Sequence, residues 1–207
     1  WQNNYETATG YYEDSLIRYP YDVQVYVNVI NAYYYLQDYE KVIEWYEVSK
    51  DYNIEIKKVK CLNNVADSYY YKRNAKAALP IYKKALELDP ANAFAHTWIG
   101  WCYIEEKNPE KGIYHCKEAL KTAAKNGYTY HGIGNGYFDT QKYDDAISFY
   151  KKAYDLMPDY SPAYNNVGRA YLNIYMQNPD KEPGMIEKSI GFFRTALEKD
   201  PQKLIAH

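Results

Sequence analysis

A tyrosine recurs every 34 residues through most of this 207-residue chain, at Tyr69, Tyr103, Tyr137 and Tyr171. A very small residue stands three positions before each of them, at Ala66, Gly100, Gly134 and Gly168. Residues three apart lie on the same face of a helix. Self-similarity at this period is typical of stacked helix pairs, none of which can bury its apolar face alone. The sequence therefore predicts a solenoid and not a closed globule.

Each 34-residue segment divides into two predicted helices joined by a short polar turn. In the segment 127–160, apolar residues follow the i, i+3, i+4 and i+7 spacing of one helix face, at Tyr130, Ile133, Gly134 and Tyr137. The polar turn from Asp139 to Lys142 is so short that the two helices must pack antiparallel. Pro158 then ends the second helix.

The same register extends over the whole chain and predicts one solenoid domain over residues 1–207. We expect the second helix of a truncated repeat at 1–22, and the start of a truncated helix at 204–207. Between them we expect five complete repeats, at 23–58, 59–92, 93–126, 127–160 and 161–203. The last is nine residues longer than the period. We place this insertion between its two helices, within Ile174 to Pro183, where Asn178-Pro179 and Glu182-Pro183-Gly184 cannot continue a helix.

The recurring small residues predict close helix packing. We expect each glycine or alanine of a first helix to face alanine on the second, because helices approach closely only where side chains are small. The recurring tyrosines are expected to fill the space between repeats. If its ring is that buried, truncating Tyr103 or Tyr137 to alanine would cost about 3 to 5 kcal/mol.

Composition and charge exclude several classes of protein. The mean hydropathy of -0.69 is low because the 28 tyrosines are scored as polar although their rings bury well, so disorder is not expected. With 25 basic and 27 acidic residues, the net charge is -2. No long run of one sign supplies the positive field that nucleic-acid binding requires. We therefore expect no nucleic-acid partner.

No stretch approaches the roughly 20 apolar residues that cross a bilayer, and no secretory signal opens the chain. We expect a soluble fragment with no membrane insertion. The three cysteines are too few for a disulfide framework and mildly favour a reducing, cytoplasmic compartment. Because the chain begins within a repeat, an export signal or lipid anchor upstream stays open.

No arrangement of residues points to catalysis, a cofactor or a metal. His96, Cys102, His115 and Cys116 share one repeat, but neither pair has the spacing of metal ligands. No Ser/His/Asp arrangement, phosphate loop or paired acidic dyad stands above chance. We therefore expect a protein that is not an enzyme, with no cofactor.

This pattern resembles the tetratricopeptide repeat family, most clearly in the copy at 127–160. The resemblance implies an all-α, right-handed superhelix of stacked antiparallel helix pairs. It also implies that the first helix of each pair lines an inner groove, which usually holds a peptide or protein segment. The fold alone does not name the partner.

If the first helices line a groove, the residues beside their packing stripe should face it. The candidate binding residues are Asn28, Asn31, Asn63, Asn64, Asp67, Phe94, Trp98, Trp101, Glu105, Tyr128, His131, Asn135, Phe138, Asn166 and Arg169. An asparagine amide both donates to and accepts from a peptide backbone, so these asparagines are predicted to grip an extended chain. The alternative is that they only satisfy contacts between helices.

Aromatic residues gather at the centre of this set. We expect Phe94, Trp98, Trp101, Tyr128 and Phe138 to form an apolar patch, and such anchors dominate binding energy at interfaces. The alternative is that the tryptophans only fill space between repeats. A clamp for a terminal carboxylate is disfavoured, because Val27, Phe94 and Trp98 stand where that clamp needs cations or polar groups.

The function that we predict is a scaffold that captures a peptide or protein segment in its groove. Two alternatives stay open. One is a structural module that self-associates through exposed end helices. The other is the regulatory arm of an enzyme whose catalytic domain lies outside this sequence.

Overall fold

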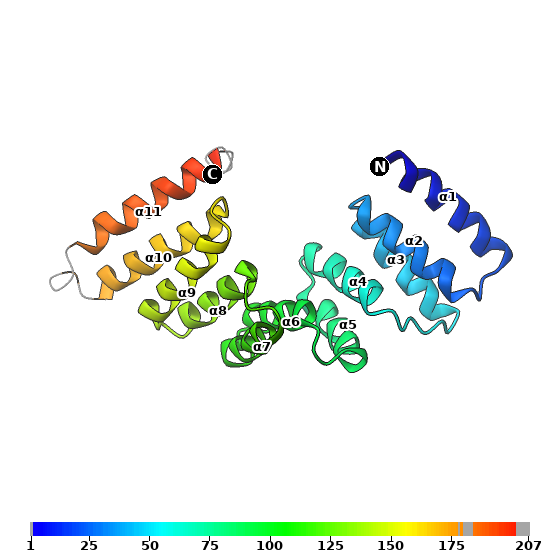
Figure 1. The fold of residues 1–207 in the computed structure, drawn as a ribbon, viewed down its shortest axis with the longest axis horizontal. Coiled ribbons are helices and arrows are strands. Elements are labelled where there is room, and N and C mark those ends of the chain that lie inside the picture. The colour runs from blue at the N-terminus through cyan, green and yellow to red at the C-terminus, as the bar shows by residue number, and fades with distance from the viewer. Residues whose placement is uncertain (1, 178, 180–183, 202–207) are drawn as a thin grey trace. The chain divides into compact units, whose positions relative to one another are not determined.

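The computed structural model describes residues 2–177, 179 and 184–201, and within them the chain forms eleven α-helices and no strand (Figure 1). Two compact units are present, residues 1–95 and 96–207, called here the first and the second unit. Among the described residues, no helix is long and apolar enough to cross a membrane.

The first unit contains five complete helices. These are α1 (Gln2–Arg18), α2 (Val23–Tyr35), α3 (Tyr39–Asp51), α4 (Val59–Tyr71) and α5 (Ala75–Leu88). Helices next to each other in sequence pack together, and α2 also packs on α4, the first helix of the following pair (Figure 1). This i to i+2 packing is the stacking that the repeat predicts.

The second unit continues the same arrangement. Helix α6 (Ala93–Glu105) has its first three residues in the first unit and the rest in the second. It is followed by α7 (Pro109–Thr122), α8 (Gly127–Asp139), α9 (Tyr143–Leu156), α10 (Ser161–Gln177) and α11 (Met185–Lys199). Consecutive helices from α7 to α11 pack against one another (Figure 1). The all-α prediction of stacked helix pairs is confirmed.

Short polar side chains start several of these helices. Asp22, Asp38, Asn74, Asn108 and Asn126 each accept a hydrogen bond from a backbone N–H of the first helical turn. These N–H groups have no partner within the helix, so each cap satisfies a donor that is otherwise lost. At α7 the cap is followed by Pro109 at the first helical position, where a missing N–H costs nothing.

The turns inside four helix pairs, α2–α3, α4–α5, α6–α7 and α8–α9, share one backbone conformation. Gln37, Arg73, Lys107 and Gln141 adopt positive φ angles of 59° or 60°. The residue after each one donates its N–H to the carbonyl five positions earlier, as Lys142 does to Tyr137. This closes the first helix with a left-handed residue and reverses the chain. It explains why the turns need so few residues.

The most deeply buried tyrosines are not those that recur every 34 residues. Tyr82 and Tyr150, on second helices, are 0% and 1% exposed, whereas Tyr103 and Tyr137 are only partly buried. Tyr103 and Tyr137 are therefore less buried than we expected, although Tyr137 packs against the core of the second unit. Lysine ammonium groups lie over two of their rings, with Lys111 5.5 Å from the centroid of Tyr103 and Lys117 5.6 Å from that of Tyr137. Such contacts belong to a half-exposed ring.

Two small residues of the first helices face an aromatic ring, which is larger than the alanine that we expected. The atoms nearest to a side chain added at Gly134 are those of the Tyr150 ring, at 2.5 Å. At Gly168 they belong to the Phe193 ring, at 2.8 Å. Gly134 and Gly168 therefore make room for an aromatic ring of the second helix, and not for a facing alanine as we expected, whereas Gly100 faces Cys116 and the small residue Gly112. A ring against a helix backbone buries more apolar surface than two small residues do.

The predicted insertion lies only partly in the described residues. Ile174 to Gln177 are helical and extend α10, which ends directly before Asn178. Residues 178 and 180–183, and the predicted start of a helix at 204–207, lie outside the described residues.

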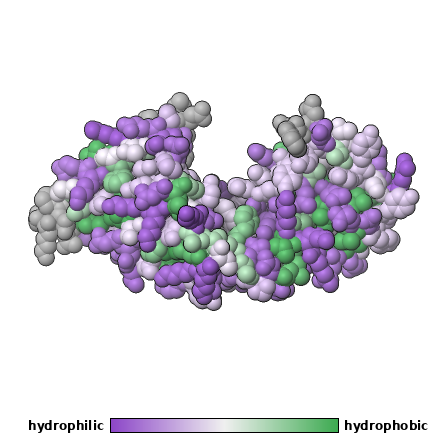
Figure 2. Space-filling model, in the orientation of Figure 1, coloured by the Kyte–Doolittle hydropathy of each residue, from purple (hydrophilic) through white to green (hydrophobic). Residues whose placement is uncertain are grey.

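Hydrophilic residues, and residues of intermediate hydropathy, cover most of the visible face of each unit, with small hydrophobic areas between them (Figure 2).

Candidate functional site

In the first unit, two of the predicted asparagines are bonded to each other. The Asn64 amide nitrogen on α4 donates to the Asn31 oxygen on α2 at 2.8 Å. The Asn28 oxygen accepts from Gln24 Nε2, also at 2.8 Å. The oxygens of Asn28 and Asn31 and the amide nitrogen of Asn64 therefore make contacts within the fold. Their remaining amide N–H groups are still donors.

Asp67 on α4 lies at the centre of a second network and is 3% exposed. It accepts hydrogen bonds from the hydroxyls of Tyr82 and Tyr34, the latter at 2.8 Å. Burial raises the pKa of this carboxyl to about 6, although both hydroxyl bonds act in the opposite direction. Asn63, one turn earlier, is also buried, and its side-chain oxygen has no hydrogen-bond partner among the described residues.

The second unit repeats the first network with different residues. Asn166 on α10 donates to the Asn135 oxygen on α8 at 3.0 Å, as Asn64 does to Asn31. The buried Tyr150 hydroxyl donates to the same Asn135 oxygen at 2.9 Å, as Tyr82 does to Asp67. Neighbouring first helices are thus joined by side-chain bonds in both units. Four of the asparagines that were predicted to hold a peptide backbone, Asn31, Asn64, Asn135 and Asn166, therefore bond to each other in pairs within the fold.

His131 occupies the interior of this second network. It is 3% exposed, and burial lowers its pKa to about 3. The Asn166 amide nitrogen donates to Nε2 at 2.9 Å, and Nδ1 lies 3.3 Å from the Tyr160 hydroxyl. Because an amide nitrogen only donates, Nε2 is the unprotonated nitrogen and the ring is neutral. His131 is therefore a buried structural residue and not an exposed contact for a ligand.

Four aromatic residues form a chain of ring contacts, two of which reach His131. Trp101 lies 5.2 Å from His131 between ring centroids, and Trp98 lies 5.8 Å from Trp101. Tyr128 completes the group, 6.3 Å from Trp98 and 5.3 Å from Tyr160. We call Trp98, Trp101, Tyr128 and Tyr160 the aromatic cluster.

The aromatic cluster is only partly buried. Tyr128 is 44% exposed, and both tryptophans are partly exposed. The Trp101 indole N–H donates to the Tyr128 carbonyl at 3.2 Å, which orients that ring. The aromatic cluster therefore leaves rings from α6, from α8 and from the turn before α10 partly open to solvent.

The structure also describes the other predicted residues of this region. Phe94 is 40% exposed and stands on α6, four residues before Trp98. Phe138 packs against Tyr143, at 5.3 Å, and under the Arg169 guanidinium, at 4.9 Å. Glu105 is exposed at the end of α6. The structure brings together the tryptophans and Tyr128, and adds Tyr160, which the repeat pattern did not indicate.

Two family models described as tetratricopeptide repeat match residues 65–127 and 127–160. The chain is a tetratricopeptide repeat protein. The matched residues run from α4 to α9 and include the tryptophans and His131.

Solved structures share this fold. A crystal structure of MamA is 22% identical to this tetratricopeptide repeat protein, covers 88% of this chain and 94% of its own, and has a TM-score of 0.64. YrrB, described as a TPR protein with an unusual peptide-binding site, is 16% identical over 94% of this chain and 95% of its own, with a TM-score of 0.65. The Cut9–Hcn1 hetero-tetramer of the APC/C matches 99% of this chain and 38% of its own at 16% identity and a TM-score of 0.73. No curated protein matches the sequence.

The histidines and cysteines of α6 and α7 do not form a metal-ligand group in this tetratricopeptide repeat protein. Nδ1 of His96 lies 3.1 Å from Nδ1 of His115. Cys102 and Cys116 are buried, and burial raises the pKa of Cys116 to about 12. No group of three or more metal-ligating side chains occurs in the described part of the chain.

The buried His131 predicts acid sensitivity in the second unit of the tetratricopeptide repeat protein. The unfolded chain takes up a proton near pH 6.5, whereas the folded chain does so only near pH 3. The free energy of unfolding should therefore fall as the pH is lowered from 6.5, by at most about 5 kcal/mol. Hydrogen exchange of the α8 to α10 amides at pH 7 and pH 4.5 measures this loss. The variant His131→Gln should lose much less stability over the same interval, and an equal loss in both proteins would contradict the assignment.

Proposed function

We propose that this protein is a non-enzymatic scaffold that binds a peptide or protein segment, with the aromatic cluster of the second unit as its anchor. The proposal rests on the contacts and the partial exposure of the aromatic rings. Trp98, Trp101 and Tyr128 are ordered by contacts with one another and are still partly open to solvent. Aromatic side chains held in this way lose little conformational entropy on binding and dominate the energy of many interfaces.

The polar residues around the cluster support the same assignment. Asn166 on α10 donates to both His131 and Asn135 on α8, and these bonds fix the relative positions of the two helices. A binding face that is already organised avoids the cost of ordering at the moment of association. We assign these three residues to holding the cluster, and the rings to contacting the partner. The description of YrrB as a peptide-binding TPR protein agrees with this class of function.

The test separates binding from folding. A peptide is selected by panning a random-peptide phage library against the purified chain, and is then synthesised. Replacing Trp98 by alanine should weaken its binding by about thirtyfold, as for an interface hot spot, and should lower the free energy of unfolding by less than about 2 kcal/mol. Calorimetric titration and urea denaturation give the two values.

A control uses Trp45 of the first unit. Trp45 donates its indole N–H to Glu13 at 3.2 Å, and Trp45→Phe should leave the affinity for the peptide unchanged. If Trp98→Ala binds the peptide normally while its stability drops by several kcal/mol, the cluster is interior packing and the assignment is wrong.

Self-association is the second candidate, and one observation favours it. On α1, Tyr11 and Ile17 are 71% and 81% exposed. Exposed apolar residues on one helix are a contact surface for a second copy. Light scattering over a range of concentrations distinguishes this candidate, because a pure peptide binder keeps the mass of a monomer.

A further inference from the structure

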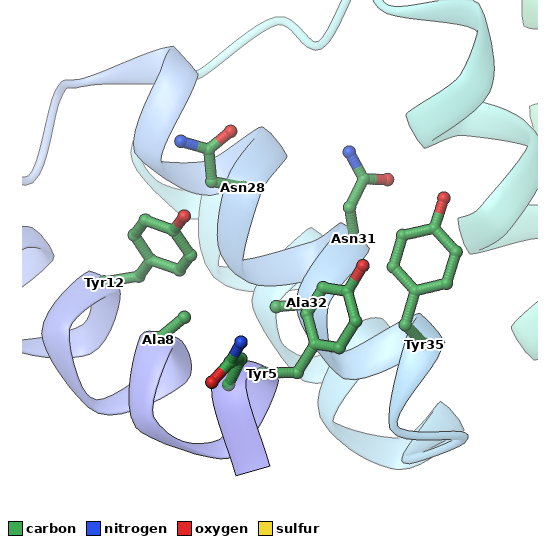
Figure 3. A pocket seen from close by; sticks show the side chains of 8 residues that line it. Tyr5, Ala8, Tyr12, Asn28, Asn31, Ala32 and Tyr35 are labelled. Carbon is green, nitrogen blue, oxygen red and sulfur yellow. The ribbon is translucent and has the colours of Figure 1, made fainter. Parts of the chain in front are cut away.

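A pocket lies between α1 and α2 in the first unit (Figure 3). Its volume of about 380 Å³ falls within the range of about 300 to 1,000 Å³ that sites for small ligands occupy. It is lined by Asn4, Tyr5, Ala8, Tyr12, Asn28, Asn31, Ala32 and Tyr35. None of these residues carries a charge, so they offer neither a cation to an acidic ligand nor a carboxylate to a basic one. The composition of the lining therefore favours a neutral ligand.

The pocket is hollow because an alanine stands between two tyrosines. Tyr5, Ala8 and Tyr12 follow the i, i+3 and i+7 spacing of one face of α1. Ala8 ends at its first side-chain carbon, so the space between the two rings stays open, and Ala32 of α2 is equally short (Figure 3). Tyr35, the last residue of α2, stacks on Tyr5 with ring centroids 5.2 Å apart. The pocket thus has a small apolar base and aromatic sides.

The two asparagine amides on α2 present chiefly their N–H groups to the pocket. The oxygen of Asn28 accepts from Gln24, and that of Asn31 accepts from Asn64, both at 2.8 Å. An asparagine that holds a peptide backbone or an adenine base donates from its nitrogen and accepts at its oxygen at the same time. At Asn28 and Asn31 such a contact would compete with a hydrogen bond that is already made. A ligand that only needs the N–H groups of these amides fits better.

The tyrosine hydroxyls supply acceptors as well as donors. Those of Tyr5 and Tyr12 can act in both ways. The Tyr35 hydroxyl is hydrogen-bonded to Lys60, whose ammonium lies 5.3 Å from the centroid of the same ring. Because an ammonium only donates, the Tyr35 hydroxyl accepts this bond and keeps its own O–H as a donor. The three hydroxyls lie on the same side of the pocket as the asparagine amides (Figure 3). A ligand on this side must therefore carry groups that both accept and donate.

We propose that this pocket binds a neutral oligosaccharide. A sugar hydroxyl accepts one hydrogen bond and donates another, so it can bridge an amide N–H and a phenol hydroxyl. The C–H faces of a sugar ring are apolar and pack on aromatic rings, and Tyr35, stacked on Tyr5, is 43% exposed. A sugar without acid groups needs no opposite charge, which agrees with the neutral lining. The site belongs to the first unit and shares no residue with the aromatic cluster.

The probes are the neutral trisaccharides maltotriose, cellotriose, xylotriose and mannotriose, each titrated into the full chain by calorimetry. We expect at least one of them to bind saturably at millimolar concentration. Its affinity should be equal at low and high salt, because no ion pair forms in the pocket. The charged trisaccharide trigalacturonic acid should bind at least about tenfold more weakly than the best neutral one.

Two variants test whether the sugar lies in the pocket. Ala8→Leu fills the space between the rings of Tyr5 and Tyr12 and should weaken binding by about tenfold or more. Asn28→Asp keeps the acceptor that Gln24 uses but removes the amide donors, and should weaken binding by a similar factor.

Each variant has a matched control. Gly10→Leu places a leucine on α1 where nothing stands within 4 Å of an added side-chain carbon, and should bind the sugar normally. Asn165→Asp introduces the same charge as Asn28→Asp at an exposed position of α10, and should also bind it normally. Trp98→Ala should keep the affinity for the sugar while it loses affinity for the phage-selected peptide. Thermal melting of each variant shows that its fold is kept.

Three results would overturn the proposal. The first is that none of the neutral trisaccharides binds at millimolar concentration. The second is that the best of them binds Ala8→Leu and Asn28→Asp as tightly as the unmodified chain, which would place the sugar elsewhere. The third is that trigalacturonic acid binds as tightly as the best neutral trisaccharide. None of these results bears on the aromatic cluster, which is tested with the phage-selected peptide.

Discussion

Replacing Tyr150 by alanine is expected to lower the free energy of unfolding of the second unit by about 3 to 5 kcal/mol. The ring is 1% exposed and packs in a core with Ala146, Ile147, Val167 and Ala170. It also fills the space beside Gly134, so its removal leaves a cavity against a helix backbone. The loss of its hydroxyl further leaves Asn135 with one donor fewer. Urea denaturation, followed by hydrogen exchange of α8 to α10, measures the effect.

Two control variants divide this loss into its parts. Tyr150→Phe keeps the ring and removes one hydrogen bond, so it should cost only about 1 kcal/mol. Tyr114→Ala truncates a tyrosine of the same unit that is 58% exposed, and should cost less than about 1 kcal/mol. If Tyr150→Ala were no more harmful than Tyr114→Ala, the ring would not be part of the core.

Replacing Gly100 by leucine is expected to destabilise the packing of α6 on α7 by more than about 3 kcal/mol. A first side-chain carbon at Gly100 would lie 2.4 Å from the Cys116 sulfur and 2.9 Å from the Gly112 carbonyl oxygen. A backbone carbonyl cannot rotate away, so the two helices must separate. Thermal melting of the variant gives the loss.

The chain offers a matched position for this substitution. Gly191 lies in α11, and nothing stands within 4 Å of a side-chain carbon added there. Gly191→Leu should leave stability unchanged or raise it by up to about 1 kcal/mol, because glycine is a poor residue inside a helix. Equal effects of the two substitutions would mean that close packing at Gly100 does not hold the pair together.

The 34-residue period predicted the helices well, because it records a packing need that every copy shares. A small residue three positions before a ring fits only a helix packed closely on another, and the turn at Thr140 to Lys142 is too short for any arrangement but an antiparallel one. The left-handed residues Arg73 and Lys107 were not predicted. Neither is glycine, so no residue type marked those positions.

Burial of the tyrosines was predicted less well, for a geometric reason. Periodicity places Tyr137 and Tyr150 on apolar faces, but does not say which face is covered on both sides. Tyr150 lies between Gly134 and the next repeat, whereas Tyr137 lies at an edge, where Lys117 covers it. Phenol rings suit both places because one end is apolar and the other polar.

The candidate site was predicted in part. Trp98, Trp101 and Tyr128 lie together as their spacing predicts. The asparagines were expected to face a ligand, but Asn64 and Asn166 bond to neighbouring first helices, and such pairing depends on the distance between repeats. Tyr160 joins the cluster from the turn before α10, outside any helical periodicity.

The central claim is that rings of the second unit, and not the bonded amides, contact the partner. It is tested most directly by following the indole N–H signals of the four tryptophans in a nuclear magnetic resonance titration with the phage-selected peptide. We predict that the signals of Trp98 and Trp101 shift in a saturable manner, while that of Trp45 does not move. Binding that leaves Trp98 and Trp101 unshifted would contradict the account.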